Sequence, residues 1–141
     1  MSALHPFAFG VLFALATACG PSTRLVTVKS GGPGEIDFQV KNLTDVPIDY
    51  FYLATTERIN AAGGPKLDHE SPAGAEAWGP DLTGHGIGVG KTERIPVPSA
   101  GKWDARAVDR DGRFQFITAL NLKAGGTYVL ELYESGWRAP N

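Results

Sequence analysis

Hydrophobic and polar residues alternate along several short stretches of this chain, a pattern typical of half-buried β-strands. Between residues 35 and 41, Ile36, Phe38 and Val40 share one face, and every residue between them is polar. The stretch from 47 to 53 is apolar on both faces, so we expect it to lie deeper in a sheet. Strands are predicted over residues 24–29, 35–41, 47–53, 93–97, 102–109, 113–122 and 127–133.

Turn signals rich in glycine and proline separate these stretches. They include Pro98–Gly101, Asp109–Gly112 and Ala124–Gly126. A chain of 141 residues can build one domain with a real core, and seven short strands are typical of a sandwich. The sequence therefore predicts an all-β fold, a single antiparallel seven-stranded β-sandwich of immunoglobulin-like or transthyretin-like type, over residues 24–134 with a tail at 135–141.

The segment from residue 55 to 90 has no sustained periodicity. Gly63-Gly64-Pro65 and Gly79-Pro80 interrupt it. Long irregular insertions are uncommon in compact domains, and those that occur often carry function. We therefore look for a working surface of this domain in the 55–90 loop.

The first residues of the sequence have the features of an export signal. Residues 6–18 are almost wholly apolar, but this run is shorter than the ~20 residues that a membrane-spanning helix needs. It ends in small residues before Cys19, the one cysteine of the chain. We expect a signal peptide over residues 1–18, removed before Cys19, and a short linker over residues 19–23 that leads into the sandwich.

Residues Ala16-Thr17-Ala18-Cys19 resemble the lipobox of bacterial lipoproteins. The resemblance covers residues 1–20 and implies that the Cys19 thiol carries a diacylglycerol, so that acyl chains such as palmitate anchor the domain. Because Gly20 is not the aspartate that signals inner-membrane retention in that family, it also implies an outer-membrane location, facing the periplasm or the cell surface. The same small residues fit ordinary Ala-x-Ala cleavage, after which the domain would be secreted with a free thiol.

Charge and reactive groups argue against several classes of function. With 13 Lys and Arg against 15 Asp and Glu, the formal charge of −2 offers no basic field for nucleic acid. There is no Gly-x-Ser-x-Gly motif, and the single cysteine lies at the export junction, so we expect no enzyme and no cofactor. Gly90-Lys91-Thr92 matches the end of a phosphate-binding loop, but His85 stands where that motif needs glycine, and the prolines that follow prevent the required helix.

Two acidic clusters are candidate metal sites. Asp109 and Asp111 have the spacing of a calcium loop, but the distal ligands are missing, and Asp-x-Asp-Gly between two strands favours a tight hairpin ending at Gly112. Asp68-His69-Glu70 holds three possible ligands in a row, and a histidine-based zinc site would need His69 together with His85. Because adjacent residues of an extended chain point in opposite directions, we expect these residues to be solvated instead.

Trp78-Gly79-Pro80-Asp81-Leu82, the strand entry at Gly90-Lys91-Thr92 and the Asp109–Gly112 hairpin together resemble a recurring pattern of small exported bacterial domains without an assigned activity. The resemblance covers roughly residues 35–133. Trp78 either folds onto the edge of the sandwich or serves as an exposed anchor for a partner. Asp81 can cap a short helical turn or join that contact. Trp137, in the tail, either closes the core or reaches a partner.

These observations predict a membrane-tethered, non-enzymatic binding or scaffold module of the cell envelope. Its partners would be the membrane, through the lipid anchor, and another envelope protein. The lipoprotein subunit of type VI secretion, also a small sandwich on a lipidated cysteine, is an architectural analogy for such a role. The alternatives are a soluble secreted or periplasmic domain that binds a ligand or a metal, and a small hydrolase.

Overall fold

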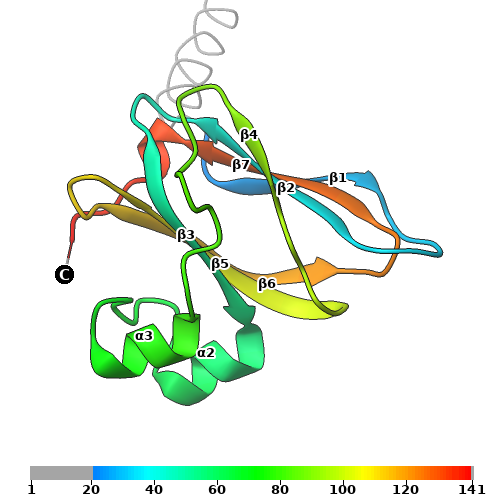
Figure 1. Cartoon of the computed structure of the whole chain (residues 1–141), viewed down its shortest axis with the longest axis horizontal. Helices are drawn as coiled ribbons and strands as arrows, with labels where there is room; N and C mark the ends of the chain where they lie inside the picture. The colour runs from blue at the N-terminus through cyan, green and yellow to red at the C-terminus, as the bar shows by residue number, and fades with distance from the viewer. Residues whose placement is uncertain (1–20, 141) are drawn as a thin grey trace, which may run out of the picture.

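Two β-sheets pack face to face in the computed structural model, which describes residues 21–140 (Figure 1). The described chain forms seven strands: β1 (Arg24–Lys29), β2 (Asp37–Leu43), β3 (Ile48–Thr55), β4 (Thr92–Ile95), β5 (Gly101–Asp109), β6 (Phe114–Leu122) and β7 (Thr127–Tyr133). One sheet has the strand order β1-β7-β2-β4, and the other has the order β3-β5-β6. The predicted signal peptide and Cys19 lie outside the described residues, so the lipid anchor stays a prediction.

Alternating apolar side chains form the core between the two sheets. Strands β2 and β7 alternate between buried and half-buried residues along their whole length, as the sequence pattern predicts. Phe38 of β2 meets Phe51 of β3 across the interface, with 6.4 Å between ring centroids, and both are fully buried. Because burying a side chain of this size is worth about 1.5–3 kcal/mol, such residues decide which face of each strand points inward.

The prediction of seven strands is confirmed, and each predicted boundary lies within two residues of the observed one. The prediction that all strands pair antiparallel is wrong, because β2 and β7 run parallel, from Asp37 opposite Thr127 to Leu43 opposite Tyr133. The four-stranded sheet is therefore mixed. Strand β7 lies between β1 and β2, which run in opposite directions. A strand between two antiparallel strands must be parallel to one of them, and no local sequence signal announces that insertion.

The segment 55–90, predicted as an irregular loop, contains two short helices, α2 (Thr56–Ala62) and α3 (Pro72–Trp78). Figure 1 shows both beside the three-stranded sheet, at the end of β3. The side-chain oxygens of Thr55 and Ser71 cap their first turns by accepting backbone N–H groups. Seven residues make only two turns, too few for a helical period to show in the sequence.

The two helices bury a second apolar cluster on the face of the three-stranded sheet that points away from the main core. This cluster consists of Tyr52, Ala54, Ile59, Ala77, Trp78, Val108 and Phe114. The insertion is thus a packed layer of the domain. A single 3-10 turn, η1 (Glu134–Gly136), follows β7. Within residues 21–140, no helix has the length and apolar character needed to cross a bilayer.

Candidate functional site

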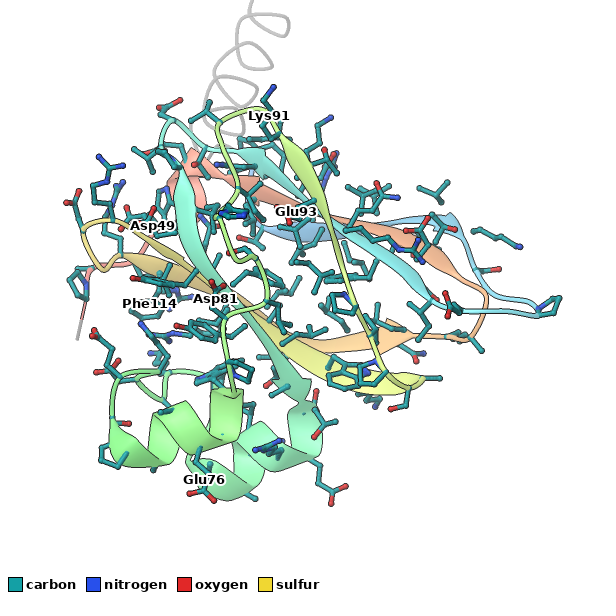
Figure 2. All side chains as sticks on the ribbon, viewed as in Figure 1. Asp49, Glu76, Asp81, Lys91, Glu93 and Phe114 are labelled. Carbon is teal, nitrogen blue, oxygen red and sulfur yellow. The ribbon has the colours of Figure 1, made fainter. Side chains whose placement is uncertain are left out.

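After α3 the chain runs along the outer edge of β3 and pairs with its backbone (Figure 1). Ile48 and Ile87 exchange two backbone hydrogen bonds, of 2.9 and 2.8 Å, and Leu82 N donates to Phe51 O over 2.9 Å. Asp81 Oδ1 accepts the N–H of Phe51 over 2.9 Å, and Figure 2 shows Asp81 beside β3. An uncovered strand edge is open to pairing with other chains, so this segment closes the sandwich on that side.

Asp81 is engaged inside the fold. Its Oδ1 also accepts Thr83 N over 3.1 Å and Thr83 Oγ1 over 3.0 Å, and Thr83 Oγ1 lies 3.1 Å from Oδ2. These bonds make an Asx turn that ties the segment to β3. Asp81 therefore caps a turn that lies outside any helix, and its part in a partner contact stays a prediction.

An open apolar cleft of about 500 Å³ lies where β3 ends and α2 begins. Three separate segments form it: the end of β3 with the first turn of α2, the end of α3 with the residues that follow it, and the connection from β4 into the start of β5. The lining residues are Leu53, Ala54, Thr55, Arg58, Trp78, Gly79, Pro80, Leu82, Pro96, Val97, Pro98 and Trp103. Small-molecule sites typically have volumes of ~300–1,000 Å³ and mainly apolar walls, so the cleft has the size and lining of a binding site.

Two tryptophans, Trp78 and Trp103, line this cleft. The indole N–H of each is already hydrogen-bonded within the protein, so both present their rings as apolar surface. Trp78 Nε1 donates to Leu67 O over 2.9 Å, and Trp103 Nε1 donates to Ser99 O over 3.0 Å. Trp78 is only 2% exposed. Of the two alternatives that the sequence left open for Trp78, the structure therefore favours the one in which its ring folds onto the sandwich. Its ring packs in the second apolar cluster and also borders the cleft.

Arg58 is the one charged side chain among the described residues that line the cleft. It lies in the first turn of α2 and is exposed. Its Nη2 donates to the backbone oxygen of Glu76 over 2.6 Å, which holds the guanidinium at the rim. Within residues 21–140, no carboxylate lies in ion-pairing distance of it. The cleft thus combines apolar walls with one positive charge.

A buried polar cluster lies under the connection between α2 and α3. Arg106 of β5 is 2% exposed. Its guanidinium carbon lies 4.1 Å from the ring centroid of Phe114, and its Nε donates to His69 Nδ1 over 3.3 Å. Burial lowers the pKa of His69 and the positive charge of Arg106 lowers it further, while burial raises the pKa of the neighbouring Tyr52 to about 12. A neutral His69 is therefore the acceptor for a buried cation.

This contact opposes a metal ion at Asp68-His69-Glu70. One ligand atom from each of these residues lies within 4.8 Å of the others. However, a cation bound at His69 Nδ1 would displace the N–H of Arg106 and lie beside its positive charge. His85 is exposed and does not belong to this group. The zinc pairing of His69 with His85 has no support in this arrangement.

Asp109 and Asp111 form the tight hairpin between β5 and β6 that the sequence favours. Asp109 Oδ1 accepts Asp111 N over 3.0 Å and Arg113 N over 2.8 Å, and its Oδ2 accepts Arg113 Nε over 2.7 Å. Gly112 has a φ of 82°, a conformation in which glycine is favoured. Both oxygens of Asp109 are thus used within the hairpin.

Trp137 packs from the tail against the main core cluster. The guanidinium carbon of Arg113 lies 5.3 Å from its ring centroid. The next residue, Arg138, exchanges two backbone hydrogen bonds with Phe114 at the start of β6. Of the two alternatives that the sequence left open, the structure therefore favours Trp137 as a residue that closes the core.

Comparisons with family models, with curated proteins and with solved structures found no match for this chain. The fold and the cleft are therefore the basis for assigning a function.

Trp78 and His69 were singled out from the sequence, but Arg58 and Trp103 of the cleft and Arg106 of the buried cluster were missed. Arg58 belongs to a helix too short to predict, and Trp103 lies in a predicted strand where a large aromatic residue is ordinary. The available signal was the alternation of Asp104, Arg106 and Val108 on one face of β5. Charged residues on a strand face usually mean solvent, and these are buried because the two helices cover that face.

Proposed function

We propose that this chain is a membrane-tethered, non-enzymatic binding module that takes an apolar ligand into the cleft between Trp78 and Trp103. The observation that carries the proposal is the cleft itself. It is open and of ligand size, and both indole N–H groups are bonded to backbone carbonyls, so that the two indoles present apolar ring surface to a guest. No matched relative supports or opposes this function.

The tether follows from the lipobox resemblance at Cys19. Between Cys19 and β1 lie four residues, Gly20–Thr23, which span at most about 14 Å when extended. A lipidated Cys19 would therefore hold the domain close to the membrane surface. On this proposal the chain is an outer-membrane lipoprotein that faces the periplasm or the cell surface, with another envelope protein as its partner. The immunoglobulin-like or transthyretin-like type of the sandwich likewise remains a proposal.

The cleft lies at the end of the sandwich away from this tether. Thr23 Oγ1 donates to Gln115 Oε1 over 2.6 Å, near the start of β6. Gln115 pairs with Ala107, which pairs with Phe51 of β3, whereas Thr55 and Trp103 pair at the cleft end. At about 3.3 Å per residue, the four residues from Phe51 to Thr55 separate these two levels of the sheet by about 13 Å. A tethered domain would thus present its cleft away from the anchoring membrane.

A neutral fluorescent probe, N-phenyl-1-naphthylamine, tests the cleft. We expect the Cys19→Ser chain to bind it with increased fluorescence, and Val97→Gln to weaken that binding because Val97 lines the cleft. Val89→Gln is the matched control, since Val89 is 51% exposed and lies outside the cleft. Thermal unfolding of each variant verifies that it is folded. No uptake by the parent chain, or equal loss in both variants, would exclude the cleft as the site.

The tether is tested separately by mass spectrometry of the protein isolated from bacterial envelopes. The wild-type chain should carry acyl mass on an N-terminal Cys19, and Cys19→Ser should lack it. A wild-type protein without acyl mass would identify the alternative, a secreted domain with a free thiol.

A further inference from the structure

We propose that the ligand of the cleft is a monoanionic amphiphile, of the class of medium- and long-chain carboxylic acids. Its tail lies along the apolar walls next to Trp78 and Trp103, and its carboxylate pairs with Arg58. This inference rests on the proposed function of the cleft and specifies the chemistry of its guest.

The charge of the lining selects an anion. Of the twelve described residues that line the cleft, Arg58 carries the single charge, and none is acidic. Glu57 precedes Arg58 in the sequence, but it lines the neighbouring hollow together with Lys102. Glu76, labelled in Figure 2, is exposed and is not among the residues that line the cleft. A cationic head group would therefore meet a positive charge at this rim, and an anionic one would find a partner.

The geometry of Arg58 leaves donors available for that partner. One N–H of its Nη2 is used by the backbone oxygen of Glu76, and a guanidinium has five N–H groups in total. The bond to Glu76 fixes the group at the rim of the cleft without neutralising it. A carboxylate can therefore accept from the remaining N–H groups of a side chain that is already positioned.

The walls favour a hydrocarbon tail over a peptide. An extended peptide carries a donor and an acceptor at each residue, and each needs a partner when it is buried. Pro80, Pro96 and Pro98 line the cleft and have no N–H to give. The N–H groups of Gly79 and Leu82 are bonded to Ala75 O and Phe51 O. A guest without polar groups along its length loses nothing here, so the walls suit an alkyl chain.

Displacement of the neutral probe from the Cys19→Ser chain tests the inference, because this chain has no acyl group that could compete. Three competitors of equal length are compared: dodecanoate, dodecanol and dodecylamine. We expect dodecanoate to displace the probe at about fivefold lower concentration than dodecanol, as an exposed charge pair allows, and dodecylamine to be the poorest competitor. High salt should reduce the advantage of dodecanoate, since it screens exposed charges.

Arg58→Gln should abolish the preference for dodecanoate, so that dodecanoate and dodecanol displace the probe at similar concentrations. Arg110→Gln, at the exposed tip of the hairpin between β5 and β6, is the matched control and should behave like the parent chain. If dodecanol competes as well as dodecanoate, or if Arg58→Gln retains the preference, the inference is overturned while the cleft remains a binding site. If neither the probe nor any competitor binds, the proposed function itself fails.

Discussion

Replacing Asp81 by alanine should loosen the segment that closes the edge of β3 and, with it, one wall of the cleft. Asp81 Oδ1 accepts the N–H of Phe51 and both the N–H and hydroxyl of Thr83. Phe51 is fully buried, so its N–H would lose its partner in a place with little access to water. A buried donor left without a partner costs ~1–3 kcal/mol, and each lost neutral bond about 1 kcal/mol. We expect Asp81→Ala to lower the free energy of unfolding by about 3 kcal/mol.

Asp81→Asn is the matched control, because its amide oxygen can still accept the N–H of Phe51. We expect it to cost about 1 kcal/mol, the difference between a charged and a neutral acceptor. Urea unfolding followed by tryptophan fluorescence measures both variants. With a slope of about 2 kcal/mol/M, Asp81→Ala should lower the midpoint by about 1.5 M and Asp81→Asn by about 0.5 M.

The same variants report on the cleft, since Pro80 and Leu82 next to Asp81 line it. Under conditions where Asp81→Ala remains folded, it should bind the neutral probe more weakly than Asp81→Asn does. A midpoint for Asp81→Ala that matches the wild type would refute the reasoning, because Phe51 would then have another partner. Equal losses in the two variants would show that the charge of Asp81, and not its place as an acceptor, is what matters.

Three further predictions follow from other contacts. Since the pKa of His69 is lowered in the fold, the unfolded chain takes up the proton first as the pH falls below about 6.5, so stability should be level above that pH and decline below it. Urea midpoints between pH 5 and 8 measure this, and His69→Gln should remove that part of the decline; an unchanged profile would contradict it. Ala119 has a φ of 55° within β6, a conformation that costs a residue other than glycine about 1–2 kcal/mol. Ala119→Gly should therefore raise the thermal unfolding temperature, even though glycine adds chain entropy to the unfolded state. A lower unfolding temperature would contradict the strain. Trp78→Ala should cost about 3–5 kcal/mol, because the residue is buried and bonded to Leu67 O, and a loss below ~1 kcal/mol in chemical unfolding would mean that it packs at the surface.

The strands were predictable because their signal is local. Alternation with a period of two is visible in β2 and β7 without knowledge of what covers them, and the bounds of β1 and β7 agree with the prediction. The parallel pairing of β2 with β7 was not predictable, because it depends on β7 entering between two strands that lie far before it in the sequence. The helices α2 and α3 are too short to show a period.

The cleft could not be predicted, because it forms where three distant segments meet. Its walls come from residues 53–58, 78–82 and 96–103, and only the first two border or belong to the segment 55–90 that the sequence indicated. Val97 lies in the connection that follows β4 in the sequence, and Trp103 lies in β5. No local sequence pattern in the three segments indicates that they meet in the folded domain.

The acidic residues of the distinctive motifs serve the fold, and the one charged group of the candidate site lies outside those motifs. Asp81 and Asp109 both stand in short segments that contain glycine, and both turn their carboxylates inward to backbone N–H groups. An Asx turn needs a short side chain whose oxygen accepts a backbone N–H group, and aspartate supplies one. In a sequence, the same aspartate can be mistaken for a metal or partner ligand. Arg58 has no motif around it, yet it is the charged group at the rim of an apolar cleft. If Arg58→Gln loses the preference for dodecanoate over dodecanol and Arg110→Gln keeps it, the binding chemistry of this domain comes from one guanidinium beside apolar walls. The acidic turns would then matter to binding only by holding those walls in place, which the comparison of Asp81→Ala with Asp81→Asn measures independently.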